Sequence, residues 1–275
     1  MLAKGLFAAK PGAGIMGRDL YVCTAGDLAT RSIASQSPEA TVTATTDWLE
    51  SEGYDVAPVI DGETVVGYVE LDHLQDAAAD DQIAAHTNPV TLEEIISTDA
   101  TFDEVLSALY ESPFYFLGGR NRLTGILTRA DLNTSPALIH LFDRITLLEE
   151  RFRELILDEA PDWKERISLD PNIVEDIEER HADARQSNIE LDEIHYAQFS
   201  MLATIISNIE VCWDACGFSS DHRASSQLDD LTELRNSVAH SQLIVQHTGE
   251  GLGKGRTIGK VEQTYTTLTD CLEAL

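Results

Sequence analysis

The chain has 275 residues, enough for two domains that each bury a core of their own. Its hydrophobic content of 43% excludes a disordered protein, and no apolar run is long enough to span a membrane. The formal net charge of -29 is spread over both halves, which excludes an acidic tail as its source.

Residues 1–17 start with a short apolar run but are too short and too glycine-rich for a secretory signal. We expect a flexible N-terminal tail, with either Met1 or Met16 as the native start. The four cysteines are scattered, and a cytoplasmic location is the simplest expectation. Cys212 and Cys216 lie one helical turn apart and could hold half a metal site, but buried thiols are the favoured interpretation, and we expect no metal.

From about Asp19 to Asn133 the chain repeats itself with a period near sixty residues. Each copy is predicted to hold a helix, two short strands joined by a turn, and a short closing helix. The first copy has its helix end near Glu52, strands at 56–60 and 64–69, and a closing helix at 71–75; the second has its helix end near Glu111, strands at 114–117 and 122–127, and a closing helix at 129–133. Two copies predict a pseudo-symmetric module rather than a solenoid.

The second copy closes with Gly125-Ile126-Leu127-Thr128-Arg129-Ala130-Asp131. One interpretation of this stretch is a capping box, with Thr128 as N-cap and Asp131 at the third helical position. The pattern also resembles the close of a CBS domain, and the repeat resembles a tandem CBS pair over about 115 residues. That resemblance implies an adenine nucleotide (AMP, ADP or ATP), with its phosphate on Thr128 and its ribose hydroxyls on Asp131. The first copy has Glu70 and His73 instead, and because Glu70 would repel phosphate we expect one nucleotide per chain.

The second half is predicted to be helical throughout. A helix starts at Ser135-Pro136 and continues with an apolar stripe. Residues 173–186 form a polar helix, and 198–216 form a strongly apolar helix that Gly217 stops. Residues 228–243 and 261–275 complete the domain. The predicted fold class is therefore α+β, with a tail at 1–17, the repeated pair at 18–135 and an all-helical domain at 136–275.

The helix predicted at 228–243 carries three polar side chains, Arg235, Asn236 and His240. Asn236 and His240, four residues apart, share one face and can touch. Arginine offers a fixed charge for phosphate, and histidine exchanges a proton near neutral pH. A polar helix end, with His240 near the negative end of the helix dipole, is the alternative interpretation.

This stretch resembles the Arg–polar–spacer–His signature of the HEPN superfamily, and a late position in an all-helical domain is the context that signature requires. The resemblance implies a metal-independent ribonuclease that acts as a homodimer. Arg235 would stabilise charge on the phosphate, His240 would move a proton, and Asn236 would hold His240 or contact RNA. The products would be a 2′,3′-cyclic phosphate and a 5′-hydroxyl.

Two functions are the main candidates, and a toxin whose partner is encoded elsewhere is a third possibility. One is a nucleotide-regulated RNA endonuclease, with RNA and not DNA as its partner and no membrane association. The other is a non-catalytic adaptor that senses adenine nucleotide and dimerises through its helical domain. The acid-rich, lysine-poor composition resembles that of halophilic archaeal proteins, where salt screens the repulsion, so the charge does not exclude RNA. The glycine-rich segment 249–256, with Gly259-Lys260, is either a loose connector or a contact to RNA phosphates.

Overall fold

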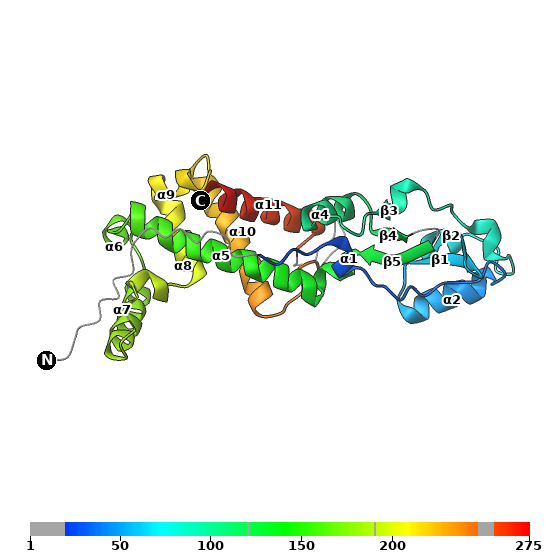
Figure 1. Ribbon diagram of the computed structural model, residues 1–275, viewed down its shortest axis with the longest axis horizontal. Helices are drawn as coiled ribbons and strands as arrows, with labels where there is room; N and C mark the ends of the chain where they lie inside the picture. The colour runs from blue at the N-terminus through cyan, green and yellow to red at the C-terminus, as the bar shows by residue number, and fades with distance from the viewer. Residues whose placement is uncertain (1–19, 120–121, 190, 247–255) are drawn as a thin grey trace.

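The computed structural model describes residues 20–119, 122–189, 191–246 and 256–275. The predicted tail at 1–17 and the loop residues 249–255 lie outside these ranges. Figure 1 shows an elongated molecule, with the strands towards one end and the helical part, built along α5, towards the other.

The first repeat folds as the sequence predicts. Helix α2 (Val42–Glu52) begins at Thr41, whose side chain accepts a hydrogen bond from the Ala44 N–H. It ends at Gly53, which has a left-handed φ of 70°. Strands β1 (Val56–Asp61) and β2 (Thr64–Glu70) form an antiparallel pair, followed by α3 (Leu71–Leu74) and the 3₁₀ turn η1 (Ile83–His86).

The second repeat has the same order of elements. Helix α4 (Phe102–Glu111) starts from a capping box between Thr101 and Glu104. Strand β4 (Phe114–Gly119) pairs antiparallel with β5 (Arg122–Thr128), and the short β3 (Ile95–Ile96), which follows η2 (Leu92–Glu94), pairs parallel with β4. The closing helix η3 (Arg129–Asn133) is a 3₁₀ helix.

Each repeat is completed by a segment that lies outside its own hairpin. In the first repeat Asn88 forms an antiparallel bridge to Tyr68 of β2; in the second, Thr30 forms the equivalent bridge to Ile126 of β5. The completing segment of the second repeat, with helix α1 (Ala25–Leu28), thus comes from before the first repeat.

The glycines that match between the repeats permit these bridges. A Cβ on Gly67 would lie 2.1 Å from the Asn88 carbonyl oxygen, and a Cβ on Gly125 would lie 3.2 Å from the Thr30 carbonyl oxygen. Real Cβ atoms do not approach a carbonyl as closely as the first distance, so the backbones meet because Gly67 has no side chain.

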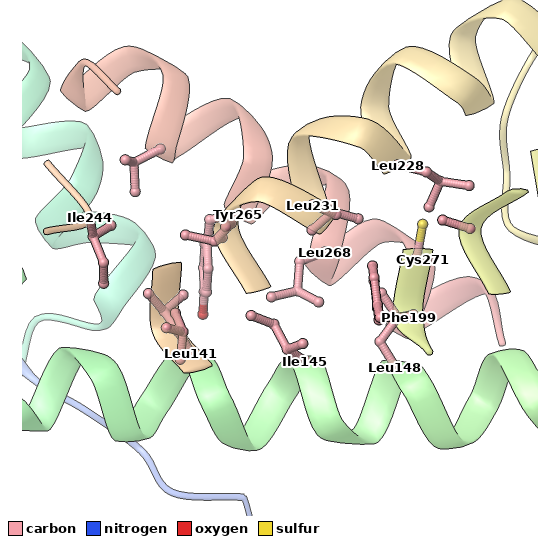
Figure 2. Close-up of a cluster of buried hydrophobic side chains, with 14 of the residues drawn as sticks. Leu141, Ile145, Leu148, Phe199, Leu228, Leu231, Ile244, Tyr265, Leu268 and Cys271 are labelled. Atoms are coloured by element: carbon pink, nitrogen blue, oxygen red, sulfur yellow. The ribbon is translucent and has the colours of Figure 1, made fainter. Parts of the chain in front are cut away.

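The rest of the described chain is helical. Its elements are α5 (Ser135–Glu159), α6 (Trp163–Arg166), α7 (Pro171–Gln186), η4 (Glu193–Tyr196), α8 (Phe199–Asn208), α9 (Glu210–Ala215), α10 (Asp221–Ala239) and α11 (Ile258–Ala274). Figure 2 shows Leu141, Ile145 and Leu148 along α5 facing side chains of α10 and α11. This core continues without a break into α4 of the second repeat, through Phe102 and Leu109.

The predicted apolar helix at 198–216 is wrong in one respect, because it is two helices broken at Ile209. Ile209 is extended, with φ −115° and ψ 115°. Just before it, the side chains of Ser207 and Asn208 both donate to the Thr204 carbonyl, at 3.1 and 2.8 Å. Such side chains offer the backbone an alternative to continued helix.

A segment as apolar as 198–216 suggests surface for a dimer, but its side chains do not supply it. Phe199, Leu202, Ile205 and Ile206 are almost fully buried within the single chain, so their apolar area is already used for folding. A dimer would have to associate through other surface.

Two further results concern the chain as a whole. The predicted fold class, α+β with a helical second part, is confirmed. Among the described residues, no helix has both the length and the apolar character needed to cross a membrane.

Candidate functional site

The structure corrects the helix that carries Arg235, Asn236 and His240. It begins at Asp221, because Ser220 caps it by accepting from the Arg223 N–H at 3.2 Å. It ends at Ala239, not at Leu243. His240 is therefore the residue that follows the last helical turn, and its position depends on how the helix is terminated.

Termination occurs through a Schellman motif. The Gln242 N–H donates to the Ser237 carbonyl at 2.8 Å, and the Ser241 N–H donates to the Val238 carbonyl at 3.2 Å. Ser241 takes the left-handed position, with φ 51°, that glycine usually occupies. The turn holds the backbone of His240 against the end of α10, since its N–H donates to the Asn236 carbonyl.

The three side chains lie at the surface. Arg235 is half-buried, whereas Asn236 and His240 are exposed. The Arg235 guanidinium donates to the Asn236 side-chain oxygen at 3.4 Å. The sequence suggested that Asn236 touches His240; in the described part of the chain the hydrogen bond of Asn236 goes to Arg235 instead. The arrangement presents a guanidinium, an amide and an imidazole to solvent, where a phosphate can reach them.

Thr128 and Asp131 contact each other as a capping box. The carboxylate Oδ2 of Asp131 accepts from the Thr128 N–H at 2.7 Å and from the Thr128 hydroxyl at 2.9 Å. Its Oδ1 accepts from the Thr30 hydroxyl at 3.3 Å. Asp131 is only 7% exposed, and burial raises its pKa, while the hydrogen bonds from Thr128 and Thr30 oppose that shift.

Thr30 is a residue of this site that sequence reasoning missed. It lies 101 positions before Asp131 and reaches it through the bridge to β5. The first repeat has Asn88 in the equivalent place, with its amide 3.5 Å from the Nδ1 of His73, which in turn lies 3.3 Å from the Glu70 carboxylate. The two repeats therefore build the same three-residue arrangement from different side chains.

The two candidate sites are joined by Asn133, which the sequence analysis also missed. Its Oδ1 accepts from the N–H groups of Ile244 and Val245 at 2.6 and 3.0 Å, and its Nδ2 donates to the Val245 carbonyl at 3.0 Å. Asn133 is on η3 with Asp131, whereas Ile244 follows His240 by four residues. The Asn133 side chain thus holds the segment after His240 against the helix that carries Asp131, a candidate nucleotide-binding residue.

The cysteines lie in the core. Cys23, Cys212, Cys216 and Cys271 are all buried free thiols, and burial raises the pKa of Cys212 to about 11. Over the described ranges, no cluster of three or more His, Cys, Asp or Glu side chains has the geometry to hold a metal ion.

Comparison with known proteins gives matches to solved structures alone. No protein-family model matches the chain, and no curated protein matches it. A putative acetoin utilization protein from Vibrio cholerae aligns with 16% identity and a TM-score of 0.37, covering 41% of this chain and 88% of its own. The CBS domains of a transcriptional regulator from Streptococcus pneumoniae align with 18% identity and a TM-score of 0.36, covering 40% and 95%.

A third structure, CBSX2 in complex with AMP, aligns with 20% identity and a TM-score of 0.35, covering 40% of this chain and 92% of its own. These likenesses lie in the N-terminal part of the chain. The helical part that carries Arg235, Asn236 and His240 is outside them.

Proposed function

We propose that the chain is a metal-independent RNA endonuclease regulated by an adenine nucleotide. It is divided at residue 135, with the CBS-like pair at 18–135 as the sensor and the HEPN-like helical domain at 136–275 as the effector. The observation that carries the proposal is the set of three hydrogen bonds made by the Asn133 side chain. They connect the helix of Thr128 and Asp131 to the segment that follows His240.

The chemistry uses the nucleophile that RNA itself supplies. The 2′-hydroxyl oxygen attacks the neighbouring phosphorus, and the bond from phosphorus to the 5′-oxygen breaks. His240 removes the 2′-hydroxyl proton or supplies a proton to the leaving 5′-oxygen. Arg235 stabilises the charge on the non-bridging oxygens, and Asn236 keeps the Arg235 guanidinium in place. In a homodimer the two copies of the motif face one cleft, so that one His240 takes a proton while the other gives one.

Cleavage is tested on purified protein in concentrated KCl with EDTA present. Arg235→Ala and His240→Ala are each expected to lose activity by about a hundredfold or more, because charge stabilisation or proton transfer is removed. The matched control is His222→Ala, an exposed histidine on the same helix, which should cleave like the wild type. Cleavage of a 2′-deoxy substrate, or cleavage that EDTA abolishes, would refute this mechanism.

Regulation is tested separately by calorimetry and by the nucleotide response of the activity. One nucleotide per chain should bind, and Asp131→Ala should lose it. Asn133→Ala should bind nucleotide like the wild type but lose the change in cleavage rate that nucleotide causes, since its three hydrogen bonds to the motif segment are gone. Two equal nucleotide sites per chain would show that the first repeat, with Glu70 and His73, is also competent.

A non-catalytic adaptor is the second candidate function, favoured by apolar side chains on the surface of α5. Ile139 is 54% exposed and Phe142 is 56% exposed, one helical turn apart. Exposed apolar pairs of this kind are suited to protein association. Wild-type protein that binds nucleotide and self-associates, yet leaves RNA intact with and without nucleotide, would favour this function over the nuclease.

A further inference from the structure

A groove of about 570 Å³ runs between the end of α10 and the start of α11. Its lining residues are all polar or charged: Glu233, Asn236, Ser237, Gln242, Gln246, Arg256, Thr257 and Lys260. Asn236 belongs both to this groove and to the three-residue motif. A ligand in the groove would therefore contact Asn236, whose side-chain oxygen accepts from the Arg235 guanidinium.

The charge of the groove differs from that of the chain. Its lining has two cations, Arg256 and Lys260, and one carboxylate, Glu233, while a second carboxylate, Asp230, contacts Lys260; the whole chain has 48 acidic residues and 19 basic ones. In a protein so acidic, a polar groove with as many cations as nearby carboxylates repels an anionic ligand less than the rest of the surface does.

Arg256 is the more informative of the two cations. Its guanidinium donates to the Ser237 hydroxyl, and its Nε lies 3.4 Å from the Ile244 carbonyl. Burial lowers its pKa, while the nearby carboxylates of Glu233 and Asp230 oppose that shift without forming a direct ion pair with Arg256 among the described residues. A half-buried guanidinium held by neutral partners keeps its charge available for a phosphate, which binds arginine in a planar, bidentate way.

Lys260 has a different environment. Its ammonium contacts the Asp230 carboxylate, and it stands in the first turn of α11, whose N-cap is the Thr257 hydroxyl. The ammonium is part-exposed, so it can turn from Asp230 to a phosphate at little cost.

We propose that this groove binds a backbone phosphate of single-stranded RNA next to the cleavage site, with Arg256 and Lys260 as its cations. The proposal rests on the proposed function and adds to it the residues that hold the substrate. We expect the groove to bind the phosphate without selecting a base, because its donors are a guanidinium, an ammonium and amides.

Binding is measured by fluorescence anisotropy with a labelled single-stranded 2′-O-methyl RNA, which lacks the nucleophile and cannot be cleaved by this chemistry. Arg256→Gln and Lys260→Gln should each weaken binding by about tenfold at the lowest salt in which the protein stays folded. Each should also reduce the slope of log K against log salt by about 0.7, the value for one phosphate of a single strand. Lys164→Gln is the matched control, since Lys164 is an ion-paired lysine near α7, away from this groove.

Melting curves identify any variant that fails to fold, and Lys260→Gln, a change at a part-exposed side chain, keeps the test valid if Arg256→Gln unfolds. Wild type that binds no RNA, or variants that bind like Lys164→Gln, would overturn the proposal. Cleavage of natural RNA is assayed in parallel to separate the two proposals. If RNA binding depends on Arg256 and Lys260 but RNA is not cleaved, the groove proposal stands and the nuclease proposal is refuted. If RNA is cleaved but binding does not depend on these residues, the nuclease proposal stands and the groove proposal is refuted.

Discussion

His140 is expected to make the protein sensitive to acid. It is 2% exposed and lies where four parts of the chain meet. Its Nδ1 accepts from the Cys23 N–H at 3.2 Å, its Nε2 lies 2.9 Å from the Tyr265 hydroxyl, and its ring stacks on Phe102 at 4.3 Å between centroids. Arg144 also points a donor at Nδ1, at 3.1 Å. Two donors at one nitrogen require the neutral ring with its proton on Nε2.

The size of this acid sensitivity follows from the pKa of His140. Burial, and secondarily Arg144, lower that pKa from 6.5 to about 4. Asp103 and Asp143 oppose that shift. Because the folded pKa is below the unfolded one, the stability that the neutral ring contributes is complete above pH 6.5 and is lost as the pH falls towards 4. Linkage gives a loss of about 2 kcal/mol in the free energy of unfolding between about pH 7 and pH 5.

The measurement is urea unfolding at constant high KCl across this pH range. Protonation of the many carboxylates changes stability as well, so the informative quantity is the difference between the wild type and His140→Gln. The variant should be less stable at neutral pH, and the difference should shrink by about 2 kcal/mol as the pH falls to about 5. His222→Gln, at an exposed position, should parallel the wild type. If the difference between wild type and His140→Gln stayed constant with pH, the assignment of a neutral, hydrogen-bonded His140 would be wrong.

Three further outcomes are expected. Gly67→Ala should cost about 2 kcal/mol of stability in thermal unfolding, because its Cβ would meet the Asn88 carbonyl at 2.1 Å; Gly118→Ala, whose Cβ would find its nearest neighbour at 3.4 Å, is the control and should cost less. The melting temperature should rise steeply with KCl, since salt screens a net charge of -29, and a flat response would contradict the halophilic interpretation. Light scattering in high salt should show a species of twice 30.2 kDa, and a monomer at micromolar concentration would contradict the shared cleft.

Local signals in the sequence were sufficient for most elements. The helices that end near Glu52 and Glu111 were predicted because each starts at a Thr cap and has an apolar spacing, signals that act within a few residues. The end of α9 before Gly217 was predicted from the glycine itself, which takes a left-handed φ of 82°. The break at Ile209 was not predicted, because the apolar pattern continues through it. The hydrogen bonds from the Ser207 and Asn208 side chains to the Thr204 carbonyl do not change that pattern.

At the candidate sites, too, the local relations were predictable from the sequence and the long-range contacts were not. Sequence alone determined that Thr128 and Asp131 form a capping box at a helix start, because that pattern is local. It also gave the spacing of Arg235, Asn236 and His240, but the contact it predicted between Asn236 and His240 was wrong, because the helix ends before His240. Only the tertiary structure decided that Thr30 reaches Asp131, that Asn133 holds Ile244, and that Arg256 meets Ser237. The first two join residues more than a hundred positions apart, and such contacts follow from how completed elements pack together, which no local pattern encodes.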